Sequence, residues 1–220
     1  MKNAVIIGAN RGIGLELSRQ LADSGWRVTA ACRKPSAELQ ALDVAVVDGV
    51  DVTDAASLDS LASVLGSDST DLLINNAGVM HPVSLDTLDP QAIRRQFEVN
   101  ALGPLLVVHA LLPTLRDKAK LALISSRMGS IADNDSGGSY GYRMSKAALN
   151  AAGKSLAHDL AERGISVAVL HPGYVRTDMT DHRGLIDVHE AAAGLLARID
   201  ALSLEKSGTF WHSNGEVLPW

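Results

Sequence analysis

Short apolar runs alternate with segments of helical periodicity along almost the whole chain. Within the runs the apolar residues are continuous rather than alternating, which is typical of strands buried on both faces of a parallel sheet. The runs occupy 3–7, 27–32, 44–47, 71–76, 121–125, 166–170 and 209–212, and the helical segments occupy 12–24, 54–65, 90–112, 142–163 and 188–201. The pattern predicts one α/β domain over residues 1–220, a Rossmann-type doubly wound parallel sheet with helices on both faces. Pro104 should kink the third helical segment or mark its true start.

Composition excludes several classes of protein. The chain has 220 residues and a net charge of -5, so it offers no basic surface for nucleic acid or anionic lipid. A single cysteine, Cys32, allows no internal disulfide and fits a reducing compartment. The first residues lack a signal-peptide core, and no apolar run approaches the roughly 20 residues of a membrane helix. We expect a soluble, cytoplasmic protein.

The first apolar run leads directly into GANRGIG, residues 8–14. Gly8, Gly12 and Gly14 would lie in a strand-to-helix turn, where backbone N–H groups can approach a pyrophosphate and the helix N-terminus adds positive charge. A plain glycine turn is the alternative interpretation. The position at the head of the first helix favours a dinucleotide site.

The second apolar run ends at Arg33 and Lys34. An NAD site usually has an acidic residue here, which binds the ribose hydroxyls, and this chain has none. Guanidinium groups bind phosphate in a bidentate fork, so Arg33, assisted by Arg11 or Lys34, favours NADP. The alternative is that these residues are solvated loop charges.

Two of the three tyrosines, Tyr140 and Tyr142, stand at the head of the fourth helical segment. Residues four apart share a helix face, so Tyr142 pairs with Lys146 and Tyr140 with Met144. An ammonium group beside a phenol favours the phenolate, so Lys146 should lower the pKa of Tyr142 towards working pH. A tyrosine of this kind can act as a general acid in carbonyl reduction.

Five motifs in this order resemble the classical short-chain dehydrogenases/reductases over essentially the whole chain. They are GANRGIG (8–14), DVTD (51–54), NNAG (75–78), the pair Tyr142 and Lys146, and HPGYVRTDM (171–179). The resemblance implies a nicotinamide cofactor, here NADP(H), and a reversible hydride transfer between it and a carbonyl or alcohol substrate. The cofactor contacts that it implies are Gly8, Asn10, Arg11, Gly12, Ile13, Gly14, Arg33, Asp51, Val52, Asn76, Ala77, Gly78, Tyr142, Lys146, Pro172, Gly173, Val175 and Thr177.

The resemblance also assigns catalytic roles. Tyr142 would donate the proton to the substrate oxygen, and Lys146 would bind the nicotinamide ribose. Ser126 matches the serine that polarises the carbonyl, with Ser125 as its rival and Ser130 as a weaker one. Asn100 matches an asparagine that holds a water on the proton path, or it is simply a polar cap or kink residue.

The chain departs from the family pattern at two places. Ile7 stands where the family has Thr or Ser, which removes a hydroxyl that helps to fix the glycine loop. The segment between Ser126 and Tyr142 is longer than usual, and it resembles the sniffer and C-factor type of carbonyl reductase, as does the ending SGTFWHSNGEVLPW.

The expected substrate pocket is lined by Met80, Tyr140 and Tyr174, although packing is an almost equal alternative for Tyr140. The histidines show no spacing for a metal site, so no metal is expected. A non-catalytic NAD(P)-binding sensor or signalling protein is the alternative function, and an epimerase of the extended branch would need a larger substrate domain. The equivalents of 90–112 and 142–163 pair across a two-fold axis in many family members, so the resemblance leads us to expect a homodimer.

Overall fold

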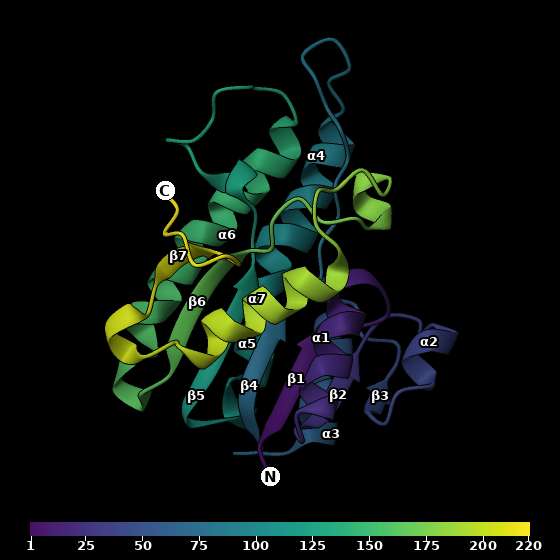
Figure 1. Cartoon of the computed structure of the whole chain (residues 1–220), viewed down its shortest axis with the longest axis vertical. Helices are drawn as coiled ribbons and strands as arrows, with labels where there is room; N and C mark the ends of the chain where they lie inside the picture. Colours follow the sequence, from purple (N-terminus) through teal and green to yellow (C-terminus); the bar gives the residue numbers. More distant parts are fainter.

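The computed structural model describes all 220 residues and contains one seven-stranded sheet. Every pairing is parallel, in the order β3-β2-β1-β4-β5-β6-β7. The strands are β1 (Asn3–Ile7), β2 (Arg27–Ala31), β3 (Ala45–Val47), β4 (Thr70–Asn75), β5 (Leu115–Ile124), β6 (Ser166–His171) and β7 (Thr209–His212). The strand order changes direction between β1 and β4, which confirms the predicted doubly wound fold (Figure 1).

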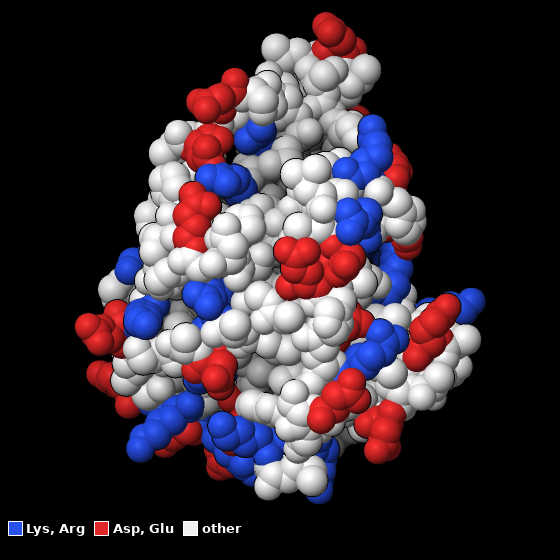
Figure 2. All heavy atoms as spheres, viewed as in Figure 1, with Lys and Arg blue, Asp and Glu red and all other residues white.

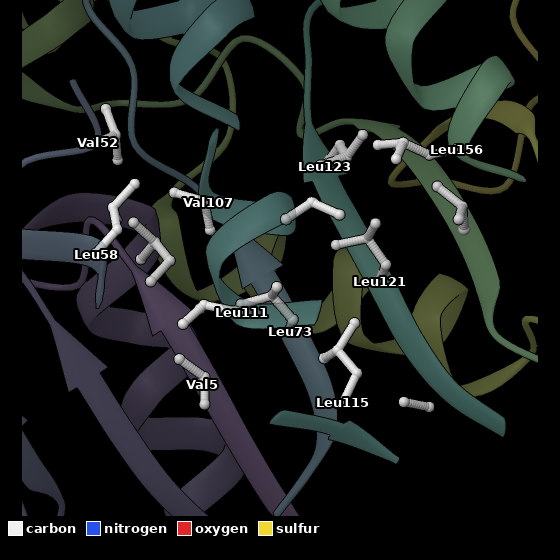
Figure 3. Close-up of a cluster of buried hydrophobic side chains, with 14 of the residues drawn as sticks. Val5, Val52, Leu58, Leu73, Val107, Leu111, Leu115, Leu121, Leu123 and Leu156 are labelled. Atoms are coloured by element: carbon white, nitrogen blue, oxygen red, sulfur yellow. The ribbon is translucent and has the colours of Figure 1, made fainter. Parts of the chain in front are cut away.

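Helices cover both faces of this sheet (Figure 1). They are α1 (Gly12–Asp23), α2 (Ala37–Gln40), α3 (Ala55–Leu65), α4 (Pro90–Phe97), α5 (Gly103–Leu111), α6 (Tyr140–Asp159) and α7 (Val188–Asp200). Alternate residues of each strand face opposite layers. Val5 and Leu73 pack with α3, α5 and α6 (Figure 3), and Ile6 and Leu72 pack with α1 and α7. The continuous apolar runs therefore build two cores.

The predicted helix over 90–112 is divided in two, as Pro104 required. The end of α4 passes into a π-helical turn, Glu98–Leu102, and α5 starts at Gly103 with Pro104 in its first turn. By length and composition, Pro90–Thr114 could cross a membrane, with a mean hydropathy of 1.3 in its most apolar window. Val107, Val108 and Leu111 are buried in the core between α3 and the sheet, which accounts for this apolar composition.

The structure differs from the sequence-based expectation at β5, at α6 and in a short additional helix, α2. β5 begins at Leu115 rather than 121, because its first part bulges against β4 and exposes charged residues that break the apolar pattern. α6 begins at Tyr140 rather than 142. The four-residue α2, whose Ser36 cap accepts a hydrogen bond from the Leu39 N–H, is too short to show a helical period.

Candidate active site

The carboxyl ends of β1 and β4 bring the two glycine-containing motifs into contact. The Asn76 Nδ2 donates a hydrogen bond of 2.9 Å to the Gly8 carbonyl. A Cβ added at Gly8, where φ is +80°, would lie 2.8 Å from the Ala77 backbone, and one at Gly14 would lie 2.2 Å from the Gly8 oxygen. Two of the motif glycines are therefore required by close backbone packing, which leaves room above them for a phosphate group.

A cavity of about 770 Å³ opens above these backbones. Twelve of the predicted cofactor residues line it: Gly8, Asn10, Arg11, Gly12, Ile13, Arg33, Asp51, Val52, Asn76, Ala77, Gly78 and Thr177. Among the other predicted contacts, Gly14 lies beneath the loop rather than in the lining. Tyr142, Lys146, Pro172, Gly173 and Val175 are also outside this lining. The shape and the glycine cradle fit a dinucleotide.

Two basic side chains at the end of the second strand reach the cavity. Arg33 and Lys34 both line the cavity, together with Asp51. Burial raises the pKa of Asp51, but its hydrogen bonds from Thr53 and the charges of Arg33 and Arg95 bring that pKa below its ordinary value. Arg95, which α4 contributes, belongs to no sequence motif, so nothing in the sequence pointed to it.

Arg11 pairs with a carboxylate from the segment after β6. Its Nη1 lies 2.5 Å from Asp178 Oδ2, and Asp178 also lies 3.2 Å from the Nε2 of His182. Asp178 and His182 line the cavity as well. The structure thus leaves Arg33 and Lys34 at the second strand, while Arg11 joins the glycine loop to the segment after β6.

Tyr142 and Lys146 lie on one buried face of α6, as their spacing predicts. Lys146 Nζ is 5.8 Å from the centre of the Tyr142 ring and donates to the Ile124 carbonyl at 2.9 Å. Burial lowers the pKa of Lys146 to about 8. Burial raises the pKa of Tyr142, and the Ser126 hydroxyl acts in the opposite direction. The expected lowering of the Tyr142 pKa by Lys146 is therefore wrong for this structure, because burial dominates and the group that opposes it is Ser126 rather than Lys146.

The three candidate serines have different partners. Ser125 donates a hydrogen bond of 2.6 Å to Asn150 Oδ1, and Ser130 donates one of 3.2 Å to the Trp220 carbonyl. Ser126 is the one of the three whose hydroxyl lowers the pKa of Tyr142. This arrangement favours Ser126 over both rivals as the group beside the reacting oxygen.

Asn100 is fully buried in the π-helical turn between α4 and α5. Its side chain bonds both the N–H and the carbonyl of Val79 at 2.8 Å, and it donates to Ser145 Oγ at 3.0 Å. A Cβ on Gly78 would lie 3.4 Å from Asn100 Oδ1 and 3.6 Å from Lys146 Nζ. Asn100 is thus more than a kink residue, since it clamps the segment after β4 to α6 beside the lysine.

The predicted substrate residues come from three separate segments: Met80 from the loop after β4, Tyr140 from the first turn of α6, and Tyr174 from the loop after β6. Tyr174 is exposed, whereas Met80 and Tyr140 are half-buried. The Tyr140 N–H approaches the Val83 carbonyl at 3.4 Å, so the start of α6 adjoins the segment that follows Met80. On the face in Figure 2, acidic and basic side chains are interspersed, so that face carries no single-sign field.

Comparison with known proteins agrees with this geometry. Residues 2–185 match the family model described as short chain dehydrogenase. The chain is 44% identical to the 1-hydroxy-2-glutathionyl-2-methyl-3-butene dehydrogenase of Rhodococcus sp. (strain AD45) over the full length of both. It is 46% identical to the C-signal protein of Myxococcus xanthus, over 68% of this chain and 92% of that protein.

Two solved structures share the whole fold. The carbonyl reductase Sniffer of D. melanogaster superposes with a TM-score of 0.92 at 28% identity and covers 100% of both chains. The NADPH-bound carbonyl reductase from chicken fatty liver superposes with a TM-score of 0.91 at 32% identity, covering 100% of this chain and 99% of that one. The chain therefore belongs to the short-chain dehydrogenase family of oxidoreductases, and its pattern is of the sniffer and C-factor type.

Proposed function

We propose that this protein is an NADP(H)-dependent oxidoreductase that interconverts a small carbonyl compound and its alcohol. The observation that carries the proposal is the convergence of Ser126, Tyr142 and Lys146 at the carboxyl end of β5, close to the dinucleotide-shaped cavity. NADPH, when bound, supplies the hydride. The protein's own residues hold the substrate oxygen and deliver the proton.

Each catalytic side chain has a separate task. Ser126 donates a hydrogen bond to the carbonyl oxygen and polarises it. Tyr142 keeps its proton because burial raises the pKa of its phenol, so it is ready to act as the general acid. Lys146 holds the ribose and, together with Asn100, lies on the route by which Tyr142 regains a proton.

Preference for NADP over NAD rests on charge at the second strand. Arg33 and Lys34 line the cavity, and no carboxylate stands at the end of β2 to repel a 2'-phosphate. The NADPH-bound structure among the similar carbonyl reductases supports the same choice.

The names of similar proteins support both directions of the reaction, a dehydrogenase acting on a hydroxylated glutathione conjugate and carbonyl reductases. A panel of aldehydes, ketones and glutathionyl alcohols should therefore be tested with NADPH or NADP by the change in nicotinamide absorbance. At least one substrate should turn over with wild type, and Tyr142→Phe should turn it over roughly a thousandfold more slowly. Turnover that survives unchanged in Tyr142→Phe would contradict the proposal.

A signalling role without catalysis is the second candidate, and the similarity to the C-signal protein favours it. Such a protein would bind NADPH without turning over any substrate in the panel. The buried Tyr142 and Lys146 support the enzymatic proposal, because two buried polar groups are costly to keep without a use.

We also propose a homodimer. Leu102 and Leu105, near the start of α5, are 50% and 43% exposed, and Met144 on α6 is 48% exposed. A second copy that packs these two regions together would cover the three apolar side chains. A monomer mass in light scattering at micromolar concentration would contradict this assembly.

A further inference from the structure

The segment that follows β7 returns to the sheet and ends beside the active site. An antiparallel bridge joins Trp211 to Val217, and the Leu218 N–H donates to the Phe210 carbonyl at 2.8 Å. Leu218 is buried, and the Trp220 ring stacks on the Phe210 ring with 5.5 Å between centres. Residues 216–220 are therefore fixed to the edge strand of the sheet, and we call them the return segment.

The return segment is tied to the turn that begins at the catalytic serine. The Trp220 carbonyl accepts hydrogen bonds from Ala132 N–H at 2.9 Å and from Ser130 Oγ at 3.2 Å. Glu216 Oε1 accepts a hydrogen bond of 3.1 Å from Arg127 Nη2, and Arg127 Nε bonds Asp133. Four links thus join residues 127–133 to one another and to the return segment.

The same turn is in close contact with α6 at the catalytic lysine. A Cβ on Gly129 would lie 2.7 Å from the Lys146 carbonyl carbon and 2.9 Å from its Cβ. Ser126, which caps the turn, accepts a hydrogen bond of 3.2 Å from the Met128 N–H. Any shift of the turn therefore moves Ser126 relative to Tyr142 and Lys146.

We propose that the return segment, through Trp220 and Glu216, positions the 127–133 turn and so sets the place of the Ser126 hydroxyl beside Tyr142. Trp220, Glu216 and Ser130 are positioning residues, since each acts through the turn. The proposal rests on the proposed carbonyl reduction only for its effect on rate. Its effect on the turn itself can be measured without any substrate.

The first test measures amide hydrogen exchange over residues 127–133. Trp220→Ala should speed exchange in this turn about tenfold, and Trp220→Phe should restore protection because a ring again stacks on Phe210. Trp26→Ala is the control, since Trp26 also packs against the core but follows α1. Unchanged exchange of the turn in Trp220→Ala overturns the proposal, whatever the enzyme does.

The second test separates positioning from loss of stability. Arg116 lies at the start of β5, and Arg127 lies shortly after the end of the same strand. Both side chains are 43% exposed and paired with a carboxylate. Arg127→Met should lower kcat about tenfold with the dissociation constant of NADPH unchanged. Arg116→Met should change the melting temperature and leave kcat alone. Equal kcat values in the two variants would contradict the positioning role.

A double-mutant cycle decides whether the effect passes through Ser126. Trp220→Ala should lower kcat roughly tenfold in wild type and have almost no further effect in Ser126→Ala, because the group that it positions is gone. Independent, multiplicative losses would show that Trp220 acts on the substrate by itself. An inactive wild type with a loosened turn in Trp220→Ala would refute the proposed function and leave the positioning intact.

Discussion

The two ends of the site hold their functional groups in different ways. At the β1–β2 end the backbone supplies the shape, through Gly8 and Gly14, and the charged side chains are exposed at the rim, with Arg11 67% exposed. At the β5–α6 end the side chains themselves are buried, with Tyr142 7% and Lys146 4% exposed. A single substitution should therefore reduce activity or stability most where one buried group performs a task alone. It should have the least effect where several exposed charges perform a task together.

Tyr142→Phe should produce the largest effect. General acids typically contribute 10²–10⁴ in rate, so we expect roughly a thousandfold loss of reduction. NADPH binding should be nearly unchanged, because the buried ring stays and only the hydroxyl is lost. Steady-state rates and NADPH titration measure the two quantities. Tyr140→Phe should be mild in comparison, and a Tyr142→Phe enzyme that keeps more than a tenth of the rate would remove Tyr142 from the acid's role.

Gly14→Ala should have the second largest effect, on both the stability of the protein and its binding of NADPH. Its Cβ would lie 2.2 Å from the Gly8 oxygen and 2.6 Å from Asn76 Nδ2, so the loop must shift. We expect a loss of about 3 kcal/mol in unfolding free energy, together with loss of NADPH binding. Gly25→Ala is the control, with φ at +80° and open space around it, and should cost only about 1 kcal/mol. Urea denaturation and NADPH titration measure both; similar losses in the two variants would contradict this reading.

Lys146 should make the stability of the protein depend on pH. Burial lowers its pKa from 10.5 to about 8, so the folded state gives up its proton before the unfolded state does. The penalty of the buried charge is full below pH 8 and is relieved as pH rises towards 10.5. Lys146→Met should therefore gain up to about 3 kcal/mol relative to wild type at neutral pH, and the gain should shrink at high pH. A difference between the two that does not vary with pH in denaturant titrations would show that the charge is not desolvated.

Arg33→Ala should give the smallest of these effects. Charge-assisted hydrogen bonds contribute about 1.5–3 kcal/mol each, so KM for NADPH should rise roughly tenfold to hundredfold and KM for NADH little. Arg33→Asp should go further by adding repulsion. The ratio of kcat/KM for the two cofactors, at fixed ionic strength, is the measurement. Arg94→Ala, next to the cavity-lining Arg95 but outside the cavity, is the control. A wild type that prefers NADH would show that the phosphate site is misassigned.

The sequence was most informative where function depends on local spacing. The glycine turn, and the shared face of Tyr142 and Lys146, follow from distances of a few residues along the chain. The partners of the serines did not follow, because Asn150 and Trp220 lie far along the chain from Ser125 and Ser130. The direction of the Tyr142 pKa shift was also missed, since it depends on how fully the ring is buried.

Arg95 and Asp178 show a second limit of the sequence. Both line the cavity, but Arg95 belongs to no motif and Asp178, although it lies within HPGYVRTDM, had no predicted role; α4 and the segment after β6 reach the cavity only through the tertiary fold. The sequence suggested that Arg11 approaches Arg33, whereas in the structure Arg11 pairs with Asp178. The partner of an exposed charged side chain is poorly predicted from the neighbouring sequence, because several oppositely charged groups can lie within its reach.

The π-helical turn Glu98–Leu102 has a consequence for changes of chain length. One residue corresponds to about 100° of helical rotation, so deleting one here would turn α5 and take Val107 and Leu111 off the core, or carry Asn100 away from Val79. Gly137 and Gly138, in contrast, have open space around them. We expect insertions and deletions to be accepted at 137–138 and rejected at 98–102, although both segments adjoin α6, the helix that carries Lys146.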